Sequence, residues 1–471
     1  MADDLAPSLS GGFPPATEAQ WRALVDKTLG EAPFDSLQKA TVEGLPIAPL
    51  YAPAERPNAP ARQPGADRAW EVATLTAHPD AARANTELLA DLRGGAAAAV
   101  VRIDPTGQRG VAIGSEAGLA RALDGVILEL APVTLDAGFL GPQAADWLSA
   151  AAKASPGALL RFHLDPLSAY AEAGASPGPI EAHLIAAANA ARRLADSYPQ
   201  AQLFLASGRV VHEAGGGEAL EVAVAASAAV AYAKALVRAG LPIAEAFART
   251  TLGLSADADY FLTIAKLRAA RAVWARIAAA CGAEPNARIE ARSSRRMLTA
   301  KDAWTNMIRL TAAGFAAAVG GADTVILGNF TDALGLPTEF ARRQSRNTQL
   351  VLMEEAHVGR VADPAAGSGY VEALTDEIAR AAWAEFQAVE AAGGLAAALA
   401  SGHVAAKAEA AKAGRPEPKI IGVTAFPPAK ETPVEVEAAA ARPVDAPSTR
   451  LPGPDSACPP LTPMRIAEPF E

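Results

Sequence analysis

Short strand-like runs alternate with helical patterns from Trp70 to about residue 358, and this alternation constrains the fold more than any other feature of the sequence. Each run is rich in apolar or β-branched residues and is followed by an amphipathic or Ala-rich stretch. Eight such repeats are typical of an α/β fold, the (β/α)8 or TIM barrel. The expected strands are 70–75, 97–104, 125–130, 158–165, 201–208, 249–256, 287–294 and 323–330. The expected helices are 79–93, 115–123, 142–154, 179–197, 217–239, 257–281, 301–319 and 337–358.

The rest of the chain falls into segments of different composition. Residues 1–60 begin with 15 residues rich in Pro, Gly and Ser that we expect to be disordered, followed by a helix from about Thr17 to Leu29 and an extended arm. The barrel takes residues 61–360, and residues 361–428 form a C-terminal helical extension. Residues 429–471 lack periodicity and are predicted to be a Pro/Ala-rich tail or linker.

The arm at 33–53 is rich in proline but keeps large apolar side chains, which a disordered linker does not normally do. We therefore expect the arm to bury these side chains along another surface, with a partner protein as the hypothesis. They are Phe34, Leu37, Leu45, Ile47, Leu50 and Tyr51.

Composition and charge exclude several classes of function. The net charge is -10 and no basic run is longer than Arg342-Arg343, which argues against nucleic acid as a partner. No apolar run approaches the roughly 20 residues of a membrane helix. The N-terminus has acidic residues where a signal peptide has basic ones, so we expect a cytoplasmic protein. Cys281 and Cys458 lie too far apart to indicate a disulfide framework or a zinc site.

Three stretches carry a resemblance to a known family: 260–277, 292–337 and 341–383. They resemble the substrate barrel of the methylmalonyl-CoA mutases, and the likeness extends from about Phe34 to Pro428. The resemblance implies a barrel that threads the pantetheine arm of acyl-CoA along its axis. It also implies a separate flavodoxin-like domain that brings adenosylcobalamin to the barrel mouth.

The departures from this family concern the residues that touch substrate and cofactor. In catalytic members, the Ser-Gly that matches Ser207-Gly208 is followed by one residue and then by a histidine, and here that histidine position is Val210. Catalytic members also have a tyrosine near the first strand, whereas this chain has none between Tyr51 and Tyr170. The Asp-x-His-x-x-Gly loop that ligates cobalt is absent around all six histidines: His78, His163, His183, His212, His357 and His403. The resemblance therefore implies a member without the cobalamin-binding domain and without catalytic residues of its own.

Three further groups have both a functional and a plain interpretation. His212 is either a displaced substrate contact or a solvated or satisfied loop histidine beside Glu213, and the second is favoured. As part of a regular strand it would lie about 6–7 Å beyond Val210 on the same face. Gly215–Gly217 could hold a phosphate at the start of the next helix but more often only makes a turn. The group at Arg342, Arg343 and Arg346 could contact coenzyme A, but helical arginines are usually solvated or ion-paired.

The cluster of Glu354, Glu355 and His357 could suggest acid–base chemistry or a metal, and structural hydrogen bonding is preferred because no third ligand has matching spacing. An unrelated barrel enzyme would need polar groups at the strand ends, where the sequence offers little beyond Asp165, His212 and Arg292.

The resemblance and its departures together imply the small, non-catalytic subunit of a heterodimeric methylmalonyl-CoA mutase. We assign no catalytic, cofactor-binding or metal-binding residue to this chain. Adenosylcobalamin is expected on a catalytic large subunit, the partner, with no nucleic acid and no membrane involved. The alternative is an active acyl-CoA mutase barrel that uses a separate cobalamin-binding chain, and Val210 counts against it.

Overall fold

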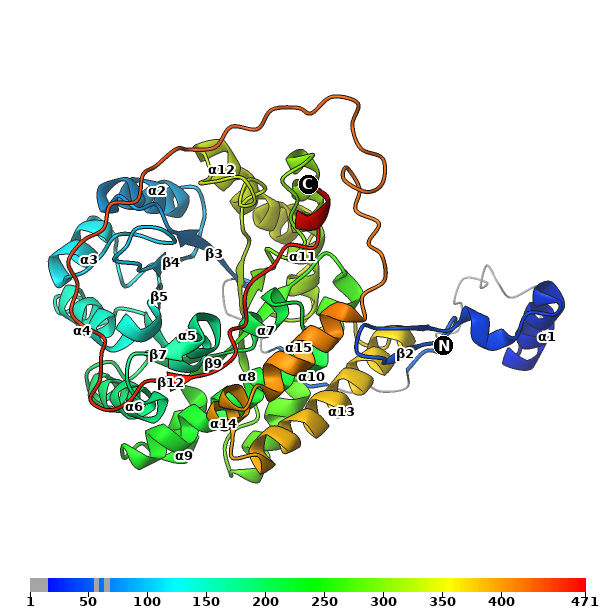
Figure 1. Ribbon diagram of the computed structural model, residues 1–471, viewed down its shortest axis with the longest axis horizontal. Coiled ribbons are helices and arrows are strands. Elements are labelled where there is room, and N and C mark those ends of the chain that lie inside the picture. Colours follow the sequence, from blue (N-terminus) through cyan, green and yellow to red (C-terminus); the bar gives the residue numbers. More distant parts are fainter. Residues whose placement is uncertain (1–15, 55–58, 63–67) are drawn as a thin grey trace, which may run out of the picture.

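Eight parallel strands close into a barrel in the computed structural model, which describes residues 16–54, 59–62 and 68–471. The expected disorder of the first 15 residues lies outside the described part. Around the barrel the strands follow the order β10, β11, β3, β4, β5, β6, β8 and β9 (Figure 1). Their bounds are β3 (Glu71–Thr76), β4 (Ala98–Arg102), β5 (Val133–Asp136), β6 (Leu160–Leu164), β8 (Gln202–Ser207), β9 (Thr250–Ala256), β10 (Arg288–Ser293) and β11 (Thr324–Ile326). The predicted (β/α)8 fold is confirmed.

The third predicted strand is wrong. Residues 125–130 form turns in which Ile127 and Leu130 are 58% and 75% exposed, and the strand begins three residues later at Val133. In β5 only alternate residues are apolar, because Val133 and Leu135 face the surrounding helices. The strand was predicted at 125–130 because that apolar run is longer than the four-residue alternating pattern of β5.

Helices surround the barrel and bury its outer face. The main core contains the outward side chains of the strands and the inner faces of the helices. The helices that follow strands are α2 (Ala81–Arg93), α3 (Glu116–Ala122), α4 (Gly141–Ala151), α5 (Pro166–Ala173), α6 (Ile180–Ser197), α7 (Arg209–Glu213), α8 (Glu218–Arg238), α9 (Ile243–Ala248), α10 (Tyr260–Ala280), α11 (Asn306–Val319) and α12 (Glu339–Leu350). Short helices η2 (Gly138–Leu140), η3 (Ala303–Thr305) and η4 (Val351–Glu355), and strand β7 (Ala175–Ser176), lie in the connections.

Helix α8 is the one helix in the described part that is long and apolar enough to cross a membrane by length and composition. However, 72% of its apolar window is buried within this protein, as expected for a core helix. It packs against the barrel on one side and against α10 and α13 (Gly369–Ala391) on others.

The C-terminal extension is helical and packs against the barrel. Helix α13 runs along α8 and α10 (Figure 1), and α14 (Leu395–Ala400) and α15 (His403–Ala413) follow it. The guanidinium of Arg268 on α10 pairs with Asp363 and Glu372, so two ion pairs join the extension to the helices around the barrel.

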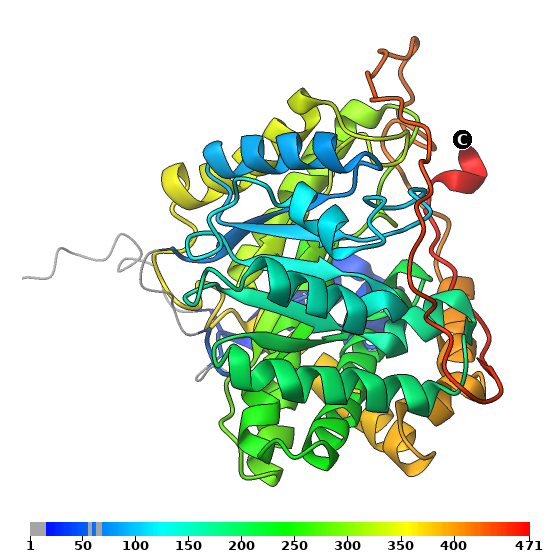
Figure 2. The same cartoon turned by 90° about the vertical axis from the view of Figure 1, so that its left-hand side faces the viewer.

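The tail at 429–471 has almost no regular structure, yet it is bound to the barrel over most of its length. It runs around one end of the barrel (Figure 2), where its backbone N–H groups donate to carbonyls of the loops that follow the strands. Val444, Leu451 and Leu461 donate in this way to Pro105, Pro177 and Ala171. Strand β12 (Ser456–Ala457) pairs with β7, and the helix η5 (Glu468–Phe470) ends the chain. The tail is therefore part of the folded barrel rim.

The N-terminal arm contains a detached part and an attached part. Helix α1 (Glu18–Leu29), capped by Thr17 in a capping box, has no buried residue and stands away from the barrel (Figure 1). After the short helix η1 (Phe34–Leu37), strands β1 (Lys39–Ala40) and β2 (Pro46–Ile47) form a hairpin that lies against the barrel.

Candidate functional site

Ion pairs cross the barrel interior near the beginning of the strands. Arg161 on β6 donates to the carboxylate of Glu71 on β3 at 2.6 Å, and Arg288 on β10 reaches the same carboxylate at 3.0 Å. Burial alone would raise the pKa of Glu71, but the two guanidinium groups lower it to about 2. Because β3, β6 and β10 are not adjacent in the barrel, these side chains span the interior.

A second layer of charges crosses the axis toward the other end of the strands. Arg292 on β10 donates to Asp136 at 3.0 Å, although β5 lies on the opposite side of the barrel from β10. Arg102 donates to the same carboxylate at 3.1 Å, and the second nitrogen of Arg292 lies 3.4 Å from Glu290. Burial raises the pKa of Asp136, but the guanidinium groups of Arg102 and Arg292 outweigh this effect and lower it overall.

His163 lies within the same layer in a strained backbone conformation, with φ at 42°. Its side chain is 1% exposed, and its Nδ1 lies 3.6 Å from Glu290 Oε2. Burial lowers the pKa of His163 to about 4, so the imidazole is neutral near pH 7. It occurs where the pairing between β6 and β8 shifts register.

On β3, β4 and β11, the strands beside these charges, the apolar side chains away from the main core are shorter than arginine. Ala73, Ala98, Val100 and Ile326 form a separate apolar cluster away from the main core. Buried charged side chains thus cross the barrel axis. In the family that the sequence resembles, the pantetheine arm is threaded along this axis. The sequence carried a signal for this arrangement, since "LRFHL" and "RIEARS" place polar groups at alternate positions of two strands. The sequence-based hypotheses named only His163 and Arg292 among these groups and did not connect them.

The structure places His212 in a different position from the predicted one. Residues 209–213 form the short helix α7, so His212 does not follow Val210 along a strand. Its side chain is 0% exposed, so of the favoured interpretation, a solvated or satisfied histidine, the satisfied form is the one observed. Nδ1 lies 3.1 Å from Glu221 of α8, and Nε2 lies 3.1 Å from Asp257 after β9.

Two buried cations complete the network around His212. Lys266 on α10 donates to Glu221 at 2.6 Å, and Arg296 after β10 donates to Asp257 at 2.9 Å. Burial raises the pKa of both carboxyl groups, but Lys266 at Glu221 and Arg296 at Asp257, each assisted by His212, outweigh burial and hold both values below the usual range. His212 therefore joins two carboxylates inside the protein and offers no free imidazole to a substrate.

The glycine run at 215–217 does lie beside an anion, as its functional interpretation suggested, but the anion belongs to this chain. The carboxylate of Glu43 accepts hydrogen bonds from the backbone N–H groups of Ala219 and Leu220 at the start of α8. The site suggested for a phosphate is therefore occupied by a carboxylate of the same chain.

The arginine group on α12 is mainly ion-paired, as the plain interpretation predicted. Arg346 donates to Asp91 of α2 at 2.8 Å, and Arg342 pairs with Asp91 and with Glu87. The guanidinium of Arg343 lies 5.8 Å from the centre of the Phe340 ring.

Glu354, Glu355 and His357 are exposed at the end of η4 and in the turn after it. Within the described residues, no group of three or more His, Cys, Asp or Glu side chains could hold a metal ion. The predicted hydrogen-bonding role of this cluster stays a prediction.

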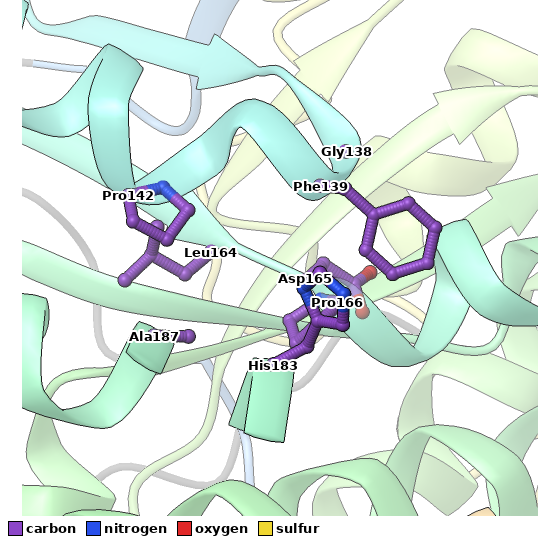
Figure 3. Close-up of a pocket in the computed structure, with 8 residues that line it drawn as sticks. All are labelled: Gly138, Phe139, Pro142, Leu164, Asp165, Pro166, His183 and Ala187. Carbon is purple, nitrogen blue, oxygen red and sulfur yellow. The ribbon is translucent and has the colours of Figure 1, made fainter. Parts of the chain in front are cut away.

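Asp165 follows β6 directly, is partly buried and lies beside Phe139 and His183 (Figure 3). It accepts hydrogen bonds from the Tyr232 hydroxyl at 2.5 Å and from the Ser168 N–H, and burial raises its pKa to about 7. The adjoining cavity has a volume of about 10 Å³, enough for no more than one water molecule. It is lined by Gly138, Phe139, Pro142, Leu164, Asp165, Pro166, His183 and Ala187.

The histidines of this chain do not fit a cobalt-ligating role. His163 and His212 are buried in the networks described above, and His183 contacts the carbonyl of Pro177. His78 is buried beside Asp80, and His403 lies 2.5 Å from Glu385. The remaining histidine, His357, is exposed in the turn after η4. No histidine of this chain is therefore assigned to a cobalamin.

Replacing His212 by alanine should lower the free energy of unfolding by about 3 kcal/mol, because it opens a cavity in the core and removes the imidazole contacts of two buried carboxylates, Glu221 and Asp257. Denaturant unfolding of the purified chain measures this loss. His403→Ala is the matched control, since its ion pair is partly exposed and should contribute under about 1 kcal/mol. Equal losses for the two variants would contradict the network.

The depressed pKa of Glu71 makes part of the stability depend on pH. Its contribution is complete above the unfolded-state pKa near 4.5 and is lost as the pH falls toward the folded-state value of about 2. The maximum contribution is about 3 kcal/mol. The stability difference between the native chain and Glu71→Gln should therefore be larger at pH 6 than at pH 3 in urea unfolding. A difference independent of pH would show that the ion pairs do not hold this carboxylate.

Comparisons with known proteins agree on the family. Residues 63–448 match the family model described as methylmalonyl-CoA mutase. The chain is 39% identical to the methylmalonyl-CoA mutase small subunit of Streptomyces virginiae, over 93% of this chain and 74% of that protein. It is 37% identical to the methylmalonyl-CoA mutase small subunit of Propionibacterium freudenreichii subsp. shermanii, over 90% of this chain and 71% of that protein. It is also 30% identical to the methylmalonyl-CoA mutase of Cereibacter sphaeroides, over 88% of this chain and 65% of that protein. This chain belongs to the methylmalonyl-CoA mutase family.

Proposed function

We propose that this chain is the small, non-catalytic subunit of a heterodimeric methylmalonyl-CoA mutase, an isomerase that interconverts (R)-methylmalonyl-CoA and succinyl-CoA. The observation that carries the proposal is the filled barrel axis. Arg161 and Arg292 reach across the interior to Glu71 and Asp136, where a substrate barrel needs a channel for the pantetheine arm. Two relatives named as small subunits, at 39% and 37% identity, support the same role.

The adenosylcobalamin of the assembled enzyme belongs to the large subunit in this proposal. When bound there, it supplies the radical that starts the carbon-skeleton rearrangement, and a protein without a cobalamin platform cannot replace that chemistry. Five of the six histidines here are engaged within the chain, as described above, and Val210 stands where catalytic members carry a substrate-binding histidine.

The alternative, an active barrel served by a separate cobalamin-binding chain, gains no support from the site. Opening the axis to a pantetheine arm would require the buried guanidinium groups of Arg161 and Arg292 to leave carboxylates that are 29% and 36% exposed, which costs less than the roughly 3–5 kcal/mol of a fully buried pair. We accordingly assign this chain a structural role, in an enzyme that we place in the cytoplasm.

The N-terminal arm remains our candidate for the contact with the large subunit, with its boundary revised. Leu45 packs against the core of its own barrel, and Tyr51 contacts Tyr370 at a ring distance of 5.3 Å. These residues are therefore not available to a partner. Leu24 on α1 is 65% exposed, and a 12-residue helix without a buried residue is marginal in water by itself. We propose that residues 16–37 are the part that reaches the large subunit.

The purified chain alone should show no cobalamin absorbance and no mutase activity, while activity should appear on addition of the large subunit. Both follow from the filled axis and from the absence of an Asp-x-His-x-x-Gly stretch among the 471 residues. The measurement is an ultraviolet–visible spectrum after incubation with adenosylcobalamin, together with a succinyl-CoA assay. Turnover by the isolated chain would favour the active-barrel alternative.

His212→Ala should leave the turnover of the assembled enzyme within about threefold, measured per folded complex, because the imidazole lies outside reach of any substrate. Its effect belongs to stability instead. A hundredfold loss of kcat in a complex that remains assembled would restore a catalytic role for this histidine.

Deleting residues 1–37 should abolish co-purification with the large subunit while leaving the melting temperature of the barrel unchanged. Deleting residues 1–53 should also abolish it but lower the melting temperature, because Leu45 and Tyr51 pack on their own barrel. Undiminished co-purification of the shorter deletion would show that the barrel surface carries the interface instead.

A further inference from the structure

The start of helix α8 lacks a capping side chain of its own. Its N-cap residue is Gly217, which makes no side-chain hydrogen bond, and the helix continues for 21 residues. The first backbone N–H groups of a helix have no partner within the helix and carry its positive partial charge. A helix of this length with a buried, uncapped start would be costly.

The arm supplies the missing cap from far away in the sequence. Glu43, at the turn of the β1–β2 hairpin, accepts from the N–H of Ala219 at 2.8 Å and from the N–H of Leu220 at 2.9 Å. Each oxygen of the carboxylate takes one of the two donors. Hydrogen bonds to a charged acceptor are the stronger kind, and the helix dipole favours the negative charge at this end.

Gly217 provides the space for this carboxylate. The backbone φ of Gly217 is -90°, which any residue can adopt, so its conformation does not require glycine. A Cβ added there would lie 2.6 Å from Glu43 Oε2 and closer still to Cδ and Cγ. The three nearest atoms all belong to Glu43. The absence of a side chain at residue 217 is therefore explained by the arm.

Among the hydrogen bonds that join the described arm to the barrel, those of Glu43 lie nearest to the detached helix. Further along the chain, Ala54 donates to the carbonyl of Gly367 at 3.2 Å, and Tyr51 packs on Tyr370. Upstream, α1 has no buried residue. Burial and the nearby charge of Glu218 raise the pKa of Glu43. The hydrogen bonds from Ala219 and Leu220 act in the other direction and favour the charged carboxylate.

We propose that Glu43 is a latch that fixes the N-terminal arm to the barrel by capping α8, and that Gly217 is the matching seat. With the latch closed, the hairpin is part of the barrel and only the residues before it are free. With the latch open, the arm is detached as far as the contacts of Tyr51 and Ala54. The proposal concerns this chain alone and does not depend on its role in a mutase.

Hydrogen exchange of the full chain tests the latch through the amides of Thr41, Gly44 and Leu45 in the hairpin and of Ala219 and Leu220 in α8. Glu43→Ala should increase their exchange about tenfold, as expected for the loss of charge-assisted hydrogen bonds. Gly217→Ala should do the same by displacing the carboxylate. Glu31→Ala is the matched control, because Glu31 is an exposed carboxylate of the same arm.

The double variant Glu43→Ala with Gly217→Ala decides whether seat and carboxylate act as one unit. The latch predicts that adding Gly217→Ala to Glu43→Ala increases exchange no further, because the group that the methyl would displace is already gone. Glu43→Gln keeps the shape of the side chain and loses its charge. Its exchange rates should lie between those of the native chain and of Glu43→Ala, at an unchanged melting temperature of the barrel. Native protection in Glu43→Ala, or an equal effect of Gly217→Ala in both backgrounds, would overturn the proposal.

Discussion

The buried ion network around His212 is the interaction on which much of the molecule depends. It joins α7, α8, α10 and the ends of two barrel strands through Glu221, Lys266, Asp257 and Arg296. Arg296 also donates to the carbonyls of His212 and Gly216, which fixes the turn before α8. Because each charge is compensated only by its neighbours in a region shielded from water, the members must fold together.

The outer segments attach around this network. The tail donates from Met464 to the carbonyl of Glu213 and from Ile466 to the carbonyl of Arg296. Arg415, after the C-terminal helices, donates to the carbonyl of Gly215, and the arm contributes Glu43 at the start of α8. Three segments that lack large cores of their own thereby obtain a rigid surface to bind. A scaffold subunit needs such a rigid surface more than it needs an open channel.

The sequence predicted the repeating architecture well, because eight alternations of strand and helix are a pattern that local residues determine. It failed where the pattern was short or where distant segments decide the outcome. Helix α7 has five residues, too few for a helical period to be visible, so His212 was expected in a loop after the strand that ends at residue 208. The tail carries no periodicity because its backbone hydrogen bonds go to the barrel rim. Glu43 and Gly217 are 174 positions apart, and nothing local in the sequence connects them.

The central claim is that charged side chains close the barrel axis, so the fold keeps its shape without the substrate channel. Calorimetric titration of the purified chain with methylmalonyl-CoA, in the absence of a large subunit, tests this claim most directly. The account predicts no saturable heat, because a pantetheine arm would have to separate Arg292 from Asp136 and Arg161 from Glu71. Saturable binding of one methylmalonyl-CoA per chain, abolished by excess coenzyme A, would contradict it.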